Sequence, residues 1–446
     1  MKKQRAKYVL FLLLFIAAAS MVHAQSANSH AFSIQQAVDY AKKNNAQVKN
    51  ALLGIQVQEQ INRGIASAAY PSISGNVSLT DYIEVPTQVI PGDFVGQPGT
   101  TKPVKFGVKY NSSALLQAQQ LLFDGQLFVG LQARKTSIEF AKKNVEVTED
   151  AIKVNIYKIY YQLVVSKTQI ELLDANIVRL EKLKHDANEM YKNGFAEKLD
   201  IDKLEVQLIN LKTEKVKALN SIAMGYNGLK TLIGMPVKDT LTLTDTITDK
   251  EIKAGALADS ANYNDRPDYQ YLQIAKQLNV YNIKRYKLSY LPTVAANGVY
   301  GKQAYRNTFS FFGKGDWYNI SYVGLNISVP IFSGFSKDAK VKQSKLELQQ
   351  TENTINNLKI SIDNDVETAK LKFNSAIETM DFQKKNMELA EKVYSQTKKK
   401  FEAGTGSNTE INTAQIDLKS AQTNYIAALY DAIIAKVDFL KATGKL

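Results

Sequence analysis

Few residues of this chain are of the types that catalyse reactions or hold metal ions. The sequence contains 3 histidines and no cysteine. His30 lies near the predicted mature N-terminus and His185 lies beside Asp186 on a lysine-rich stretch, so solvated side chains are expected rather than metal ligands. There is no Gly-rich phosphate loop, no nucleophile elbow and no histidine pair at metal spacing. The sequence therefore predicts no enzymatic activity, no cofactor and no metal site.

The charged residues are numerous but interspersed. The chain has 56 Lys and Arg against 43 Asp and Glu, which gives a formal net charge of +13. Basic and acidic residues alternate at helical spacing and form no block, which is typical of solvated helix faces carrying salt bridges. We therefore expect no nucleic acid partner.

The N-terminus has the pattern of a cleavable secretory signal, assigned to residues 1–24. A basic start is followed by an apolar run from Tyr8 to Ala19 and by the small-x-small cut site Val22-His23-Ala24. Removal of its four cationic residues lowers the net charge to about +9. The protein is therefore expected to be exported, without a lipid-anchoring cysteine or disulfides.

The mature sequence contains an internal repeat. Leu122-Phe123-Asp124-Gly125 recurs as Ile331-Phe332-Ser333-Gly334, and Tyr191-Lys192-Asn193-Gly194-Phe195 recurs as Phe401-Glu402-Ala403-Gly404-Thr405, both at an offset of about 210 residues. Such a long offset indicates duplication of one large unit. We assign a first repeat to 25–232, a linker or equatorial region to 233–264, and a second repeat to 265–446.

Each repeat contains a proline-free stretch that predicts a very long helix, Gly125 to Lys192 and Phe335 to Glu402. Apolar or small residues follow a 4,3 spacing in both, which is a coiled-coil seam. A Gly-containing break then precedes a second periodic stretch, as expected for antiparallel helical hairpins over 125–232 and 335–443. The seam positions are Ile152, Ile156, Ile159, Leu163, Ser166, Ile170, Leu173, Ile177 and Leu180 in the first repeat, and Ile362, Val366, Ala369, Phe373, Ala376, Met380, Gln383, Met387, Ala390 and Tyr394 in the second.

Ahead of each helical hairpin, period-2 alternation predicts a β-hairpin, over 71–123 and 291–332. In the first repeat the expected strands are Ser72 to Val85 and Val104 to Tyr110, with a loop from Pro86 to Pro103. In the second repeat they are Val294 to Tyr305 and Trp317 to Ile331. Each repeat also begins with a helix.

The strand pattern fits either a bilayer-spanning barrel or a soluble sheet with one wet face. Four strands cannot close a barrel, and an open edge cannot lie in lipid, so a membrane-spanning chain must oligomerise. Three copies would supply twelve strands, enough to enclose a pore. The aromatic residues expected at the membrane interfaces are Tyr82, Tyr300, Tyr305, Trp317 and Tyr318.

These features together resemble the outer membrane efflux protein family, the TolC-like outer membrane factors. The most specific matches are the strand-to-helix junction from Val323 to Gly334 and the hairpin turn Phe401-Glu402-Ala403-Gly404-Thr405. The resemblance implies a mainly α fold with a β-barrel portion: a homotrimer with a 12-stranded barrel and a 12-helix tunnel. It further implies location in the outer membrane of a Gram-negative bacterium, extending into the periplasm. The strand-helix junctions would then include Phe123, Gly125, Pro330, Phe332 and Gly334.

The resemblance also assigns roles to the hairpin turns. It implies that the tips contact a periplasmic adaptor protein, which links the duct to an inner-membrane pump of the RND, ABC or MFS type. The tip residues are Asn193, Gly194, Phe195, Gly404, Thr405 and Gly406.

The periplasmic entrance is the second site that the resemblance implies. Asp200 and Glu410 match the acidic residue six places after each turn glycine, and Glu410 would contribute to a carboxylate ring. The chain has Thr413 where the family member compared has a second acidic residue. Because acidic residues near a helix start also complement its dipole, local capping stays an alternative for Asp200 and Glu410.

The expected function is passive conduction of substrates delivered by an adaptor and pump, in efflux or type I secretion. Opening is expected to be a rearrangement of the second hairpin against the first. The alternative from another class is an exported coiled-coil scaffold or adhesin without a pore.

Overall fold

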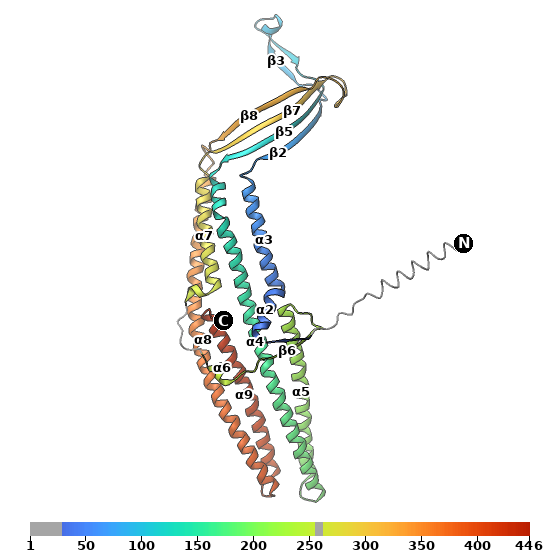
Figure 1. The fold of residues 1–446 in the computed structure, drawn as a ribbon, viewed down its shortest axis with the longest axis vertical. Helices are drawn as coiled ribbons and strands as arrows, with labels where there is room; N and C mark the ends of the chain where they lie inside the picture. Colours follow the sequence, from blue (N-terminus) through green and yellow to red (C-terminus); the bar gives the residue numbers. More distant parts are fainter. Residues whose placement is uncertain (1–28, 255–261) are drawn as a thin grey trace, which may run out of the picture. The chain divides into compact units, whose positions relative to one another are not determined.

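The computed structural model describes residues 29–254 and 262–446 (Figure 1). The predicted signal peptide, 1–24, lies outside the described residues. The chain forms two compact units. The helical unit comprises the described residues of 1–53, 143–270 and 357–446, and the sheet unit comprises 54–142 and 271–356. None of the helices in the described part of the chain has the length and apolar character needed to cross a bilayer.

Both predicted helical hairpins are confirmed. The first consists of α4 (Gly125–Lys192) and α5 (Lys198–Ile233), and the second of α8 (Ser336–Glu402) and α9 (Asn408–Ala442) (Figure 1). Gly194 and Gly404 end the long helices with φ of 80° and 71°, a left-handed backbone that glycine adopts without a steric cost. The Phe195 amide donates to the Met190 carbonyl at 2.8 Å, which satisfies an otherwise free acceptor at the helix end.

The predicted seams form the core of the helical unit. Ile156 on α4, Leu204 on α5, Ile362 on α8 and Ile411 on α9 are each at most 1% exposed. Near the turns, one buried cluster draws side chains from all four helices, so the two hairpins share a core there. Its buried members are Leu173, Ile177, Leu180, Leu183, Ala187, Leu204, Leu208, Leu211, Tyr394, Phe401, Ile411, Ala414 and Leu418.

The sheet unit contains a four-stranded antiparallel sheet in the order β2-β5-β7-β8. Its strands are β2 (Ser72–Asp81), β5 (Tyr110–Phe123), β7 (Thr293–Arg306) and β8 (Tyr318–Ser328). All strand-helix connections, including those to α3 (Ala46–Ser67) and α7 (Pro267–Leu288), leave from one end of the sheet. The connections 82–109 and 307–317 leave from the other, which we call the loop end.

The second strand of the first repeat was misplaced by the sequence pattern. It was expected from Val104 to Tyr110, whereas β5 only begins at Tyr110. Residues 101–105 instead form β4 (Thr101–Lys105), which pairs with β3 (Thr87–Pro91) in a separate two-stranded sheet with the short helix η1 (Gly92–Val95) between them. Gly107, with φ of 129°, interrupts the extended backbone before β5. The neighbouring apolar residues Leu115 and Leu116 obscure the alternation within β5 itself.

The linker between the repeats packs on the start of the mature chain. Strand β1 (Ser29–Phe32) pairs in parallel with β6 (Thr240–Leu243), and the linker also forms α6 (Asp249–Lys253) and η2 (Tyr263–Asp265). Asp245 accepts a hydrogen bond at 2.8 Å from the Ile34 amide, at the first turn of α2 (Ile34–Asn44). A carboxylate there also complements the dipole of α2.

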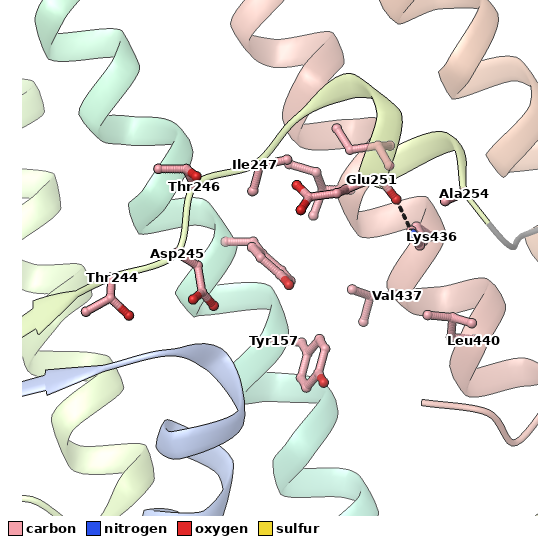
Figure 2. Close-up of a pocket in the computed structure, with 13 residues that line it drawn as sticks. Tyr157, Thr244, Asp245, Thr246, Ile247, Glu251, Ala254, Lys436, Val437 and Leu440 are labelled. Atoms are coloured by element: carbon pink, nitrogen blue, oxygen red, sulfur yellow. Dashed lines mark hydrogen bonds between the residues drawn. The ribbon is translucent and has the colours of Figure 1, made fainter.

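A cavity of about 650 Å³ lies under this linker, between α4 and α9 (Figure 2). Lys436 on α9 donates to the Glu251 backbone carbonyl, and burial lowers the pKa of Lys436. The Tyr160 hydroxyl donates to the Phe32 carbonyl at 2.9 Å, and burial raises the pKa of Tyr160 to about 12. Single contacts of this kind hold the linker and the N-terminal segment on the helices.

Candidate functional site

The four-stranded sheet has two faces of opposite character, because side chains alternate along each strand. One face, here called the apolar face, carries large apolar side chains that a soluble sheet would bury. Val323 is 90% exposed and Leu325 is 67% exposed. With their cross-strand neighbours, the apolar face comprises Ile73, Val77, Leu79, Ala114, Leu116, Ala118, Tyr300, Val323, Leu325 and Ile327.

The opposite face, here called the polar face, is lined mainly by small hydroxyl and amide side chains. Asn76 on β2 donates to Gln117 on β5 at 3.0 Å. None of the side chains that the alternation places on this face carries a formal charge. Its hydrophilic members are Ser72, Ser74, Asn76, Ser78, Thr80, Asn111, Ser113, Gln117, Gln119, Asn297, Gln303, Tyr305, Tyr318, Tyr322, Asn326 and Ser328.

The sheet has two open edges. Within the described residues, β2 and β8 each pair on one side only, so each leaves a row of backbone N-H and C=O groups unpaired. An edge with an exposed apolar face cannot stand in lipid without a pairing strand. The sheet of one chain is therefore structurally incomplete.

Four of the five predicted interface aromatics divide between the two faces, and Tyr82 lies beyond the sheet. Tyr300 and Trp317 line one groove on the apolar face. Tyr305 and Tyr318 lie on the polar face with ring centroids 6.3 Å apart. The Tyr82 amide donates to the Lys109 carbonyl at 2.8 Å, just beyond the end of β2. An interface role thus stays a proposal for Tyr300 and Trp317.

Sequence reasoning missed an aromatic cluster at the loop end. Tyr110 makes edge contacts with Phe309 and Phe311, at centroid distances of 5.6 and 5.9 Å. The Ser112 hydroxyl donates to the Phe311 carbonyl at 3.1 Å, which holds the 307–317 loop on the sheet. The only sequence signal was the Phe-rich composition of that loop.

The predicted strand-helix junctions include a close backbone approach and a left-handed glycine. A Cβ atom on Gly125 would lie 2.7 Å from the Leu288 carbonyl oxygen, so only glycine fits there. Gly334 has φ of 57°. The ring centroids of Phe123 and Phe128 are 5.6 Å apart. Phe332 follows Pro330 by two residues, and its ring centroid lies 5.6 Å from that of Phe335.

The hairpin tips differ in their aromatic side chains. At the first tip Asn193 and Gly194 are exposed, and Phe195 is 80% exposed. At the second tip Gly404 and Thr405 are exposed and Gly406 is half-buried. Phe401, just before that turn, is only 6% exposed. The first tip therefore presents an unpartnered aromatic ring, and the second does not.

The three residues assigned to the entrance lie on two hairpins. Glu410 and Thr413 are exposed on the first turns of α9, and Asp200 is on the first turn of α5. Asp200 pairs with Lys203 at 3.8 Å, and Glu410 pairs with Lys400 at 3.9 Å. Neither carboxylate caps its helix: the N-terminus of α5 has no side-chain cap, and Ser407 caps α9 by accepting from the Glu410 amide at 3.1 Å. The described residues show no contact joining Asp200 to Glu410 or Thr413.

A buried polar network, which sequence reasoning missed, joins the two hairpins. Asn176 on α4 is 2% exposed and donates to Gln422 on α9 at 2.7 Å. Gln415 on α9 and Arg179 on α4 both donate to Asn176 Oδ1, at 3.0 and 2.8 Å. Beside it, Lys419 on α9 pairs with Glu214 on α5 at 2.5 Å. The signal was a second 4,3 stripe on α9, made of Asn408, Asn412, Gln415, Lys419 and Gln422.

Two long helical hairpins attached to a sheet with one apolar and one uncharged polar face define the architecture of an outer-membrane channel subunit. Comparison with known proteins agrees. Residues 264–445 match the family model "Outer membrane efflux protein". The chain is 20% identical over 340 residues to the outer membrane protein TolC of Vibrio cholerae, covering 75% of this chain and 77% of that protein. It is 20% identical over 413 residues to the outer membrane efflux protein BepC of Brucella suis, covering 91% and 84%.

Solved structures show the same fold. The structure of CusC, described in terms of transmembrane channel formation, superposes with a TM-score of 0.76 at 15% identity, covering 95% of each chain. These findings confirm the resemblance to the outer membrane efflux protein family and the predicted fold class. They also confirm the predicted location in a Gram-negative outer membrane with a periplasmic extension. The matched names describe channel and efflux proteins rather than enzymes.

Proposed function

We propose that this chain is one subunit of a trimeric outer-membrane duct that works in a tripartite efflux or type I secretion system. The observation that carries the proposal is the four-stranded sheet with two open edges, an exposed apolar face and an uncharged polar face. Such a sheet is stable in a bilayer only when other strands close both edges.

Three copies can close all the open edges if the sheet of each copy pairs with the sheet of the next. The four strands alternate in direction, so β8 of one copy runs antiparallel to β2 of the next. Three sheets joined in this way give twelve strands, which enclose a water-filled lumen rather than a packed core. The apolar face then contacts lipid and the polar face lines the duct.

The lumen lining supports passive conduction. Serine, asparagine and glutamine side chains offer hydrogen bonds of both kinds to passing water and solutes, and they bring no fixed charge that would select by sign. The duct then adds little selectivity in the barrel, and the pump chooses the cargo. This lining is compatible with efflux and with secretion.

The hairpin tips are the proposed adaptor contact. Phe195 is largely exposed at the first tip, and exposed aromatic residues are strong anchors in protein interfaces. A periplasmic adaptor that docks on Asn193, Gly194 and Phe195, and on the matching turn at Gly404, Thr405 and Gly406, would connect the duct to an inner-membrane pump.

The proposed entrance lies close to the tips. Glu410 from three copies would form one carboxylate ring around the axis, with Asp200 as a second acidic contribution from the other hairpin. Thr413 leaves the next level of the entrance uncharged. Because a single ring of three carboxylates concentrates less charge than two rings, we expect only weak binding of multivalent cations.

Opening requires the second hairpin to move against the first. The polar contacts that would have to rearrange are the hydrogen bonds of Asn176 with Gln415 and Gln422, and the Lys419–Glu214 ion pair. The apolar core that the two hairpins share near the turns would have to shift with them. A hydrogen-bonded interface can exchange partners with water during such motion, whereas an apolar interface would expose its surface. We therefore propose that these polar contacts help to hold the two hairpins together in the closed state.

Engineered cysteines test the edge contact directly, because the chain has no native cysteine. Ser74→Cys on β2 would be combined in turn with Tyr322→Cys, Asn326→Cys or Ser328→Cys on β8, all on the polar face. At least one combination should give a reducible, covalently linked trimer in isolated outer membranes. Gln117→Cys on the inner strand β5, combined with the same β8 positions, is the matched control and should give none. Absence of intermolecular products from every β2 and β8 combination would contradict the proposal.

A further inference from the structure

A groove with a positive charge lies on the apolar face, midway along β2, β5 and β7. This groove has a volume of about 700 Å³ and lies in the sheet unit. It is wide because Gly75 and Ala114 contribute little or no side chain on this face. Leu116, Tyr300 and Trp317 form apolar walls, and Lys302 lies at the groove as its one charged lining residue.

Lys302 has no carboxylate partner among the described residues. It stands on a face made largely of apolar side chains, opposite Ala114 and Asn319 on the neighbouring strands. The nearest acidic residue on the paired strands, Asp81, is engaged by Lys109 at 3.9 Å. A lysine on a lipid-facing surface needs either water or an anion at its ammonium group.

Arg306 stands four residues further along β7, on the same face. Its Nη1 atom donates to the Ser310 carbonyl at 2.7 Å, and its guanidinium lies 5.7 Å from the Trp317 ring. Its Nη2 atom is buried and has no hydrogen-bond partner among the described residues.

The two cations can serve one headgroup. Four residues of extended strand separate the Lys302 and Arg306 backbones by about 13 Å, a span that two long side chains can close from both sides. Arg306 pairs with Tyr110 at the loop end, beside the aromatic cluster of Tyr110, Phe309 and Phe311, and Lys302 lies four residues further from that end. Aromatic residues concentrate at the level of lipid headgroups, so this end of the apolar face lies at the headgroup level.

We infer that the groove binds a phosphorylated lipid of the outer leaflet, with an acyl chain against Tyr300 and Leu116 and the headgroup phosphates on Lys302 and Arg306. Charge complementarity selects an anionic lipid, and the fork of the guanidinium suits phosphate oxygens. Lys314 in the adjacent loop adds positive charge, and Asp316 partly offsets it. The inference rests on the proposed function, since it needs the apolar face to stand in a membrane.

The test is retention of lipid by the purified full-length protein in mild detergent, measured by native mass spectrometry. The probes are diphosphorylated lipid A, its dephosphorylated form, phosphatidylethanolamine and inorganic phosphate. The expected result is binding of diphosphorylated lipid A that falls about tenfold in Lys302→Gln and in Arg306→Gln. The control Lys284→Gln, an exposed lysine on α7, should bind as the wild type does.

Other outcomes separate the possibilities. Equal retention of phosphatidylethanolamine, or unchanged binding in Lys302→Gln, would overturn the inference. Competition by inorganic phosphate at equal concentration would mean a free-anion site and would also overturn it. Because the same spectra report the oligomeric mass, an intact trimer without lipid defeats only this inference. A monomer would instead defeat the proposed duct.

Discussion

Gln415 on α9 donates a hydrogen bond from its side-chain nitrogen to Asn176 Oδ1 on α4, over 3.0 Å, and so links the second helical hairpin to the first. Asn176 is 2% exposed, and its own amide nitrogen donates to Gln422 and to the Leu172 carbonyl. One asparagine therefore holds several contacts at the interface whose rearrangement would open the duct.

Asn176→Leu should favour the open state. The substitution leaves the Gln415, Gln422 and Arg179 side chains without partners, and buried groups left unpaired cost about 1–3 kcal/mol. We expect the open population in planar bilayers to rise about tenfold, read as an increase in conductance. Asn210→Leu, an exposed position on α5, is the control and should leave conductance unchanged. If Asn176→Leu had the conductance of the wild type, this network would not be what holds the hairpins in the closed state.

Breaking the Lys419–Glu214 ion pair should also raise the conductance, but by less than Asn176→Leu does. Its side chains are 36% and 37% exposed, and an ion pair of this exposure contributes about 0–1 kcal/mol. Glu214→Lys places two cations together and should raise conductance severalfold, most clearly at low salt. Adding Lys419→Glu to that variant reverses the pair and should restore the wild-type value. If the double variant were as open as the single one, the pair would have no role in closure.

Phe195→Asp should abolish adaptor-dependent transport without disturbing assembly. Phe195 is 80% exposed at the first tip, so its loss removes contact area but no core packing. We expect susceptibility of cells to exported compounds to rise to the level of a deletion strain. The matched control is Phe94→Asp, because Phe94 is 82% exposed in the connection between β2 and β5 at the loop end. Normal transport by Phe195→Asp would exclude this tip as an adaptor contact.

The helical half of the molecule was predictable because its signals are local and repeated. The 4,3 seams, which include Ile156 on α4 and Ile362 on α8, identify the buried side of each long helix. Gly194 and Gly404 mark the turns, where the backbone is left-handed. Repetition at a constant offset made these signals mutually supporting. The long helices consequently begin and end within a residue or two of the predicted limits.

The sheet and the polar links were harder for physical reasons. Strand β5 carries Leu115 beside Leu116, on opposite faces of the sheet, and so loses its clean alternation. The Asn176 network joins residues far apart in the chain, and an asparagine on a helix surface is usually solvated. Which face receives Tyr305 or Trp317 depends on register, which becomes visible only when the strands are paired.

Tyr160→Phe should destabilise the attachment of the linker. The Tyr160 hydroxyl donates to the Phe32 carbonyl at 2.9 Å and accepts from the Asp245 amide at 3.3 Å, and the side chain is fully buried. Removing the hydroxyl leaves the Asp245 amide without its acceptor, at a cost of about 1–3 kcal/mol in the free energy of unfolding. The Phe32 carbonyl keeps its hydrogen bond from the Thr244 amide at 3.1 Å. Protease cleavage within the linker should accelerate accordingly. Tyr191→Phe, which alters an exposed residue, is the control, and equal cleavage rates in the two variants would contradict this account of the linker.

The block of conductance by multivalent cations should depend on the charges at positions Glu410 and Thr413. Glu410→Gln should remove the block of conductance by multivalent cations added from the periplasmic side, and Thr413→Asp should tighten that block about tenfold by adding a second carboxylate level. The control is Glu402→Gln, an exposed carboxylate just before the second turn, which pairs with Lys398 at 3.6 Å. A block that persists in Glu410→Gln would place the constriction at other residues.

The mass of the mature protein, extracted from the outer membrane in mild detergent and corrected for bound detergent, tests the central claim most directly. The account predicts a trimer of about three times the mass of the mature chain, because only pooled strands satisfy the open edges of β2 and β8. A monomer released from the membrane by salt or urea without detergent would contradict it. That result would remove the barrel, and the exported scaffold would become the better description of the chain.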